Sequence, residues 1–208
     1  MPIHHLVAGV HSFKASAFRS RQELFEGLGR GQHPDALFIT CSDSRIDPNL
    51  LTQMSPGSLF TIRNAGNIVP PYGRSNGGEG PTLEYAVRAL GVSDVIVCGH
   101  SHCGAMKALL DPAKLVDLPL VASFLEFAEG TRRIMWEAYR SSGREQLLEL
   151  TIQENVLVQL ESLRSYPFVA ERLDAGTLKL HGWYYVIETA EVFLYDPARN
   201  AFTTLDGG

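Results

Sequence analysis

Short apolar runs separated by helical segments constrain the fold of this chain more than any other feature of its sequence. Three such runs, residues 36–40, 58–62 and 93–98, are five or six residues long and rich in Val, Ile, Leu and Phe. Runs of this length predict strands that are buried on both faces. Buried strands that alternate with helices are typical of a parallel sheet covered by helices. The sequence therefore predicts an α/β fold with a mainly parallel central sheet flanked by helices.

Helices are expected wherever apolar residues recur at helical spacing. These segments are residues 4–30, 81–90, a stretch that begins at Gly104, 119–140 and 144–165. Gly91 supplies a stop signal after the second of them. Residues 177–187 and 191–195 predict a C-terminal antiparallel hairpin that turns near Thr189 and Ala190. Residues 70–80, with several Gly and Pro, fit a loop inside the domain.

Composition excludes several classes of protein. The chain has 208 residues, 45% hydrophobic and 20% charged, which suits one globular domain. A net charge of -5 argues against nucleic acid or an anionic membrane as a partner. No apolar run approaches the ~18 residues that a membrane helix needs. The first ten residues lack the basic-then-apolar layout of a secretory signal, so we expect a cytoplasmic protein.

The three cysteines point to a metal site or to catalysis, because an odd number in a cytosolic protein makes a poor disulfide framework. Cys41 follows the first predicted strand, and His100 and Cys103 follow the third, so all three are expected at the carboxyl edge of the sheet. Two thiolates and one imidazole suit Zn²⁺, and three protein ligands leave a fourth position open, as in catalytic zinc. Cys98 lies within a strand and is expected to be a buried small residue.

Alternatives to a catalytic zinc remain at this point. A structural zinc would need a fourth ligand, and the only local one, His102, neighbours both His100 and Cys103. Asp43 is close enough to reach the metal, and Arg45 is close enough to clamp it in a bidentate pair, although a surface ion pair is the simpler interpretation. A phosphatase loop would need a longer spacing between Cys and Arg than the three residues found here.

Three blocks of sequence resemble the signature motifs of the beta-class carbonic anhydrases. They are CSDSR at 41–45, RNAGN at 63–67 and GHSHCG at 99–104, and the likeness extends through HGWYY at 181–185 to cover nearly the whole chain. The resemblance implies reversible hydration of CO₂ to bicarbonate and a proton by a metal-bound hydroxide. It implies one zinc per chain, held by Cys41, His100 and Cys103.

The same resemblance implies a single domain over residues 1–208. Residues 1–31 would form a helical arm that wraps a partner subunit, and residues 32–208 would form the α/β core. Active sites of the family lie at a dimer interface, so we expect a homodimer or a dimer-based oligomer. Asp43 would orient the zinc-bound hydroxide while Arg45 holds it, and would close the site if that pair broke.

Within the family the chain resembles the plant-type branch. Gln32 matches a substrate-binding Gln, Phe60 and Tyr85 match aromatic pocket residues, and Ala65 lies close by in the sequence. Several of these reach in from the neighbouring subunit in relatives. The backbone N–H of Gly104, with Gln32, would hold an oxygen that develops charge.

Two further positions bear on regulation and proton transfer. Phe38 stands where the other branch has Trp, so bicarbonate inhibition is not expected. Ala89 stands where some members carry a proton-carrying His, and His33 and His102 are the remaining candidate relays, although surface or supporting roles are the simpler interpretation.

The nearest resemblance is to cyanobacterial carboxysomal enzymes, through residues 46–50, 70–73 and 76–80. Those enzymes usually carry a long C-terminal extension, so carboxysome targeting is not expected for a chain that ends at Gly208. Two alternatives remain: hydrolysis of another heterocumulene such as carbonyl sulfide or carbon disulfide, and a non-catalytic shell or scaffold protein that kept the fold.

Overall fold

The computed structural model describes residues 3–74, 77–139 and 143–204. The chain divides into two compact units, Met1–His33 and Pro34–Gly208. Residues 75–76 of the predicted loop, which include Asn76 of the 76–80 motif, and residue 140 of the predicted helix over 119–140 lie outside the described residues.

The first unit is helical but interrupted. It contains α1 (His4–Ser12), a π-helical turn over Phe13–Ala17, a 3-10 turn over Arg19–Arg21 and α2 (Gln22–Leu28). The prediction of one continuous helix over 4–30 is therefore wrong in detail, since Arg21 leaves helical geometry with φ -130°. In a regular helix Phe18 would point ~140° away from Phe13. The irregular turns instead bring the Phe13, Phe18 and Phe25 rings together, with centroids 5.4 to 6.3 Å apart.

The second unit is built on a six-stranded sheet with the order β2-β1-β3-β4-β5-β6. Four strands pair in parallel, and the last two are antiparallel. Their bounds are β1 (Ala36–Cys41), β2 (Leu59–Asn64), β3 (Asp94–His100), β4 (Lys179–Tyr185), β5 (Val192–Asp196) and β6 (Ala201–Thr204). The mainly parallel α/β fold with an antiparallel C-terminal hairpin is confirmed, whereas β6 was not predicted.

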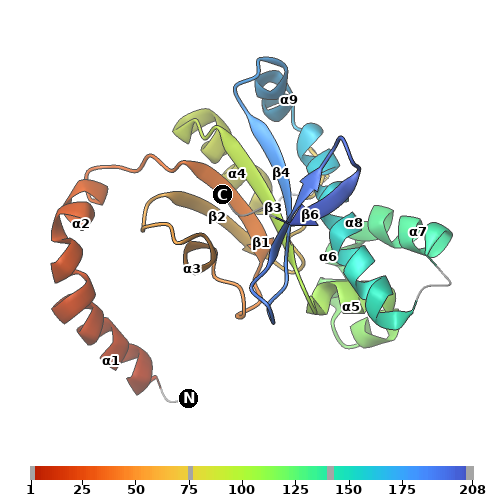
Figure 1. Ribbon diagram of the computed structural model, residues 1–208, viewed down its shortest axis with the longest axis horizontal. Helices are drawn as coiled ribbons and strands as arrows, with labels where there is room; N and C mark the ends of the chain where they lie inside the picture. The colour runs from red at the N-terminus through yellow and green to blue at the C-terminus, as the bar shows by residue number, and fades with distance from the viewer. Residues whose placement is uncertain (1–2, 75–76, 140–142, 205–208) are drawn as a thin grey trace. The chain divides into compact units, whose positions relative to one another are not determined.

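Helices connect and cover these strands (Figure 1). They are α3 (Pro48–Thr52), α4 (Glu79–Glu84), α5 (Gly104–Leu110), α6 (Pro119–Leu125), α7 (Glu129–Ala138), α8 (Arg144–Arg164) and α9 (Pro167–Asp174). A π-helical turn, Tyr85–Leu90, extends α4 to the expected stop at Gly91, which has φ 71°. The helix predicted over 119–140 is split, because Glu126–Ala128 forms a 3-10 turn and Ala128 has φ -101°.

The two short helices α3 and α9 were not predicted. Each is too short for apolar periodicity to show, and each begins with a proline at its first turn, where the missing N–H costs nothing. Asp47 also caps α3, since its Oδ1 accepts from the backbone N–H of Leu50 at 3.0 Å.

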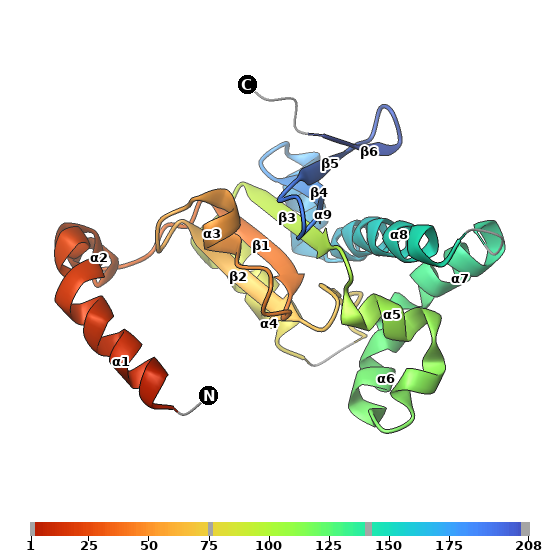
Figure 2. The same ribbon diagram turned by 60° about the horizontal axis from the view of Figure 1, so that its bottom comes forward.

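The central strands β1 and β3 are buried on both faces, as their apolar sequences predict, whereas this prediction is wrong for β2, an edge strand in which Thr61 and Arg63 are exposed. Alternate residues of β1 point to opposite faces. Leu37 and Ile39 pack with residues of α4, α8 and α9, whereas Ala36 and Phe38 pack with Ile46 of the segment that leads into α3. Figures 1 and 2 show α3 and α4 on opposite sides of the sheet.

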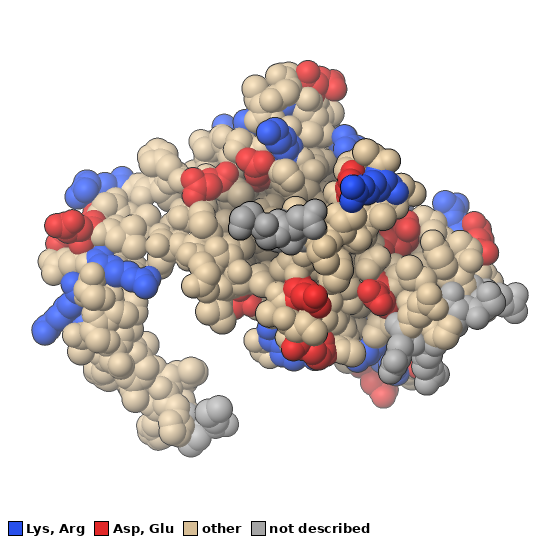
Figure 3. Space-filling view, in the orientation of Figure 1, with Lys and Arg blue, Asp and Glu red and all other residues tan. Residues whose placement is uncertain are grey.

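The surface carries both signs of charge. On the face of the second unit seen in Figure 3, basic and acidic side chains are interspersed rather than gathered by sign. Among the described residues, no helix has the length and apolar character needed to cross a membrane.

Candidate metal centre

Three sulfur and nitrogen donors converge at the carboxyl edge of the parallel strands. Cys41 is the last residue of β1, His100 is the last residue of β3, and Cys103 directly precedes α5. One ligand atom from each lies within 4.8 Å of the other two, and all three residues are buried. Neighbouring strands bring Cys41 and His100 together, because Thr40 and Cys98 are partners in the β1–β3 register.

A sharp turn brings Cys103 back toward His100. His102 adopts the left-handed region with φ 57°, which few residues other than glycine take up at low cost. The chain therefore reverses between the end of β3 and the start of α5. This reversal lets two residues three positions apart face one point.

The His100 ring is oriented by its own chain. Its Nδ1 donates to the carbonyl oxygen of Ser101 at 2.8 Å, because a carbonyl oxygen can only accept, so Nε2 is the ring nitrogen that remains to bind an ion. Nε2 is buried and has no hydrogen-bond partner among the residues that the structure describes. Asp43 Oδ2 lies 3.8 Å from it, which is beyond hydrogen-bond distance. A buried nitrogen lone pair without a partner is costly unless a metal ion takes it.

The two candidate thiol ligands shift each other's pKa in opposite directions. Hydrogen bonding between the two side chains lowers the pKa of Cys41, and together with burial it raises the pKa of Cys103. The backbone N–H of Gly66 also donates to Cys41 Sγ, at 3.5 Å. Cysteine ligands bind metals as thiolates, so a thiol in such a site is expected to release its proton when the metal binds.

Cys98 is not part of this group. It is fully buried in β3 and packs with Phe38 and Ile96 on the sheet face that contacts Ile46. Burial raises the pKa of its thiol. The sequence interpretation of Cys98 as an unreactive core residue agrees with this position.

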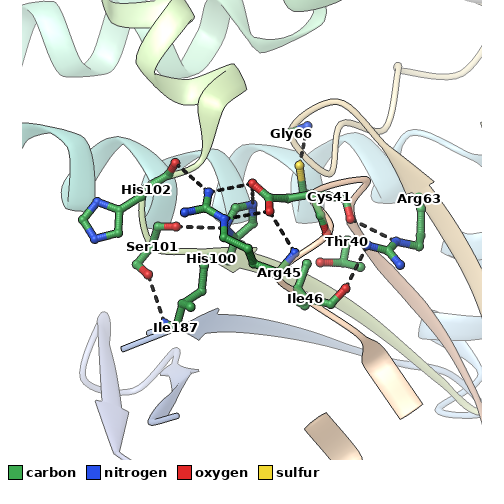
Figure 4. A network of polar contacts seen from close by, with 12 residues as sticks. Thr40, Cys41, Arg45, Ile46, Arg63, Gly66, His100, Ser101, His102 and Ile187 are labelled. Carbon is green, nitrogen blue, oxygen red and sulfur yellow. Dashed lines mark hydrogen bonds and ion pairs between the residues drawn. The ribbon is translucent and has the colours of Figure 1, made fainter. Parts of the chain in front are cut away.

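Arg45, which is labelled in Figure 4, forms a bidentate ion pair with Asp43. Arg45 Nε donates to Asp43 Oδ1 at 2.9 Å, and Arg45 Nη2 donates to Oδ2 at 2.7 Å. The backbone N–H of Arg45 also donates to Oδ1, at 3.0 Å. These donors hold the pKa of the Asp43 carboxyl well below its usual range, so it stays ionised at neutral pH.

Arg63 holds the segment that carries Asp43, a role that sequence reasoning missed. Its guanidinium donates to the carbonyl oxygens of Cys41, Asp43 and Ile46 at 3.1, 2.7 and 2.8 Å. Figure 4 shows Arg63 on the far side of Cys41 from Arg45. Arg63 is the first residue of the RNAGN motif, which was the only sequence signal for a role of this residue. The sequence did not indicate which carbonyl oxygens its guanidinium would bind.

A second missed group supports the His100–Cys103 turn. Ser101 Oγ donates to Glu188 at 3.0 Å and accepts from the backbone N–H of Ile187 at 3.0 Å. His102 pairs with the same carboxylate, with Nε2 and Oε1 2.6 Å apart. The connection between β4 and β5 thus ties down the loop that bears two donors.

The predicted substrate residues fall into two groups. Ala65 lies between Asn64, which pairs with Cys41 in the β1–β2 register, and Gly66, whose N–H donates to the Cys41 sulfur. Gly104 is the first residue of α5 and directly follows Cys103. Phe60 and Tyr85 contact each other, with ring centroids 5.9 Å apart.

Phe60, however, is not beside the donors of its own chain. It pairs with Leu37, which lies four residues before Cys41 in β1, or ~13 Å along the strand. The structure therefore does not bring the Phe60–Tyr85 pair to the metal donors of the same chain. Gln32 belongs to the other compact unit, Met1–His33.

Comparison with known proteins gives one family. A sequence model described as carbonic anhydrase matches residues 36–192. A carbonic anhydrase of Synechocystis is 52% identical over 95% of this chain and 72% of its own length. A carbonic anhydrase of Pseudomonas aeruginosa is 47% identical over 96% of this chain and 90% of its own length.

Solved structures agree with the sequence comparison. The beta-carbonic anhydrase CcaA has a TM-score of 0.96 and 50% identity, and the match covers 98% of this chain and 100% of that one. A tetrameric beta-carbonic anhydrase of Sordaria macrospora has a TM-score of 0.83 and 26% identity over 92% of this chain and 95% of that one. On the fold, the motifs and these likenesses, the chain belongs to the beta-class carbonic anhydrase family.

Proposed function

We propose that this chain catalyses the reversible hydration of CO₂ to bicarbonate and a proton with one zinc ion per chain. The observation that carries the proposal is the buried Nε2 of His100, which lacks a partner and lies among two cysteine sulfurs. Two thiolates and one neutral imidazole are ligands that zinc prefers. Cys41, His100 and Cys103 would hold it. Zinc in such a site supplies a Lewis acid that lowers the pKa of a water molecule toward neutrality.

Asp43 orients the reacting water in this proposal. Arg45 occupies one side of its carboxylate and keeps it ionised, so the carboxylate can accept a hydrogen bond donated by the O–H of that water. Arg63 fixes the backbone on either side of Asp43 through the carbonyl oxygens of Cys41 and Ile46. The Asp43–Arg45 pair is thus a positioned acceptor rather than a loose surface ion pair.

The substrate pocket needs a second copy of the chain. Phe60 and Tyr85 are remote from the donors of their own chain, whereas Ala65 and the Gly104 N–H adjoin them. We propose that Gln32, Phe60 and Tyr85 of one chain complete the pocket of another. The exposed apolar side chains of α1, namely Leu6, Val7 and Val10, support association as a homodimer or dimer-based oligomer. The cytoplasmic location stays a prediction of the sequence.

Metal-quantified activity tests the proposal. Stopped-flow CO₂ hydration is expected to scale with the zinc content of the protein, and size-exclusion chromatography with light scattering is expected to show a dimer or a multiple of it. Parallel assays with carbonyl sulfide and carbon disulfide distinguish CO₂ hydration from the alternative activity, hydrolysis of another heterocumulene. Zinc-loaded protein without hydration activity at alkaline pH would overturn the proposal and favour a non-catalytic scaffold.

A further inference from the structure

Helix α8 carries none of the residues assigned to the site, yet it has polar side chains in its most buried turns. Asn155 and Gln159 are fully buried, as is Thr131 of the neighbouring α7. Buried amides are costly unless their hydrogen bonds are made. Their partners therefore show what holds them inside the protein.

These partners lie in the loop that follows β2. Asn155 Nδ2 donates to the carbonyl oxygen of Gly66 at 2.9 Å, and Gln159 Oε1 accepts from the backbone N–H of Val69 at 2.8 Å. The two amides are linked, since Gln159 Nε2 donates to Asn155 Oδ1 at 3.0 Å. Thr131 Oγ1 donates to the same oxygen at 3.4 Å. Two adjacent turns of α8 thus fix both ends of the 66–69 segment.

The other side of Gly66 faces the metal donors. Its N–H donates to Cys41 Sγ at 3.5 Å, while its carbonyl oxygen accepts from Asn155. Both groups are attached to one Cα, so anchoring the carbonyl limits where the N–H can point. Gly66 has φ 80°, and a Cβ there would lie 3.0 Å from Ala105 Cβ and 3.0 Å from Met106 Cε. Residue 66 is therefore held between β1, α5 and α8.

Helix α8 is a firm base for this anchor. A Cβ at Gly99 of β3 would lie 2.8 Å from Ile152 Cγ2 and 3.0 Å from Val156 Cγ2, so α8 packs directly on the backbone of the strand that ends in His100. The position of Asn155 is thus set by the same strand that positions a metal donor.

From this geometry we propose that Asn155, supported by Gln159 and Thr131, is a positioning residue that aims the Gly66 N–H at the Cys41 sulfur and thereby strengthens zinc binding. The inference rests on the proposed zinc function. A hydrogen bond to a ligand sulfur fixes the ligand and offsets its charge, and loss of such an outer partner typically weakens metal affinity by about 10-fold to 100-fold.

Asn155→Leu tests the inference, with Thr151→Val as a matched control. Thr151 is equally buried on the same helix, but its hydroxyl donates only to the Leu147 carbonyl oxygen within α8, at 2.6 Å. We expect zinc loss to a chelator to be about 10-fold faster in Asn155→Leu and unchanged in Thr151→Val. Cobalt-substituted protein is expected to show a changed sulfur-to-metal charge-transfer band only in the Asn155 variant.

Thermal unfolding separates a metal effect from a purely structural one. If Asn155 acts only on packing, substitution lowers the melting temperatures of zinc-loaded and metal-free protein equally. If it acts through Gly66, the gap between the two temperatures narrows, because zinc then stabilises the fold less. Thr131→Val, which removes only the 3.4 Å bond to Asn155, gives a smaller change of the same sign and keeps the test decisive if Asn155→Leu does not fold.

The outcomes distinguish this inference from the proposed function. If the wild type binds zinc, and the Asn155 and Thr131 variants lose zinc to a chelator at the wild-type rate, this inference is overturned and the proposed function is not. Equal effects of Asn155→Leu and Thr151→Val overturn it as well. A wild-type protein that binds no zinc would overturn the proposed function, and this inference with it.

Discussion

Replacement of Gly66 by alanine tests how tightly the loop after β2 is packed against the metal centre. Gly66 has φ 80°, a conformation that costs an L-residue about 1–2 kcal/mol. The added methyl would also meet Ala105 Cβ and Met106 Cε at 3.0 Å each. Crowding of this kind in a packed core costs about 1–3 kcal/mol. The free energy of unfolding should therefore fall by about 2–5 kcal/mol in all.

Gly91→Ala is the matched control for this prediction. Gly91 has nearly the same φ, 71°, but a Cβ there would meet nothing within 4 Å, so only the backbone cost of about 1–2 kcal/mol applies. Urea unfolding of both variants at one protein concentration measures the difference, which is the cost of crowding α5. Equal losses in Gly66→Ala and Gly91→Ala would refute the close packing of Gly66 on the helix that follows Cys103.

Three further predictions concern the donors and the ion pair. Arg45→Ala should lower CO₂ hydration at all pH values, because Asp43 then loses the two guanidinium donors that hold its carboxylate in place; unchanged activity across pH in stopped-flow assays would contradict this prediction. Folding lowers the pKa of Asp43, so the ionised Asp43 stabilises the fold at pH values above the ordinary carboxyl pKa. This stabilisation is lost as the pH falls toward the lowered pKa of the folded chain. Arg45→Ala should therefore make the melting temperature depend less on pH in the acid range, which thermal unfolding at several pH values measures. Cys103→Ser should lose most of its zinc by elemental analysis, whereas Cys98→Ala should keep one zinc per chain and lose only about 1 kcal/mol of stability; zinc loss in the Cys98 variant would contradict the ligand assignment.

The parallel core could be predicted because its signals are local. The segments 36–40, 58–62 and 93–98 are short, mostly apolar runs, and Gly91 ends the helix before the third. The irregular elements could not be predicted this way. The break near Arg21 depends on three Phe rings meeting, and α3 and α9 are shorter than the window in which periodicity shows.

The convergence of Cys41, His100 and Cys103 was predictable from residue type and strand ends, but the side chains that support these three residues were not. Cys41, His100 and Cys103 follow strands whose carboxyl ends must meet at one edge. The supporting contacts join side chains to backbone atoms or to residues remote in the sequence, so motif spacing does not predict them. They are made by Arg63, Glu188 and Asn155. Phe60 and Tyr85 were matched by motif alone, and the register of β1 and β2 shows that they are far from the donors of their own chain.

The account depends most on the claim that Cys41, His100 and Cys103 bind a zinc ion required for CO₂ hydration. Zinc content and stopped-flow CO₂ hydration, measured on the same samples during stepwise removal and return of the metal, test it most directly. The account predicts one zinc per chain at full activity, and activity that falls and recovers in proportion to zinc. Full activity in protein with well under one zinc per chain would contradict it.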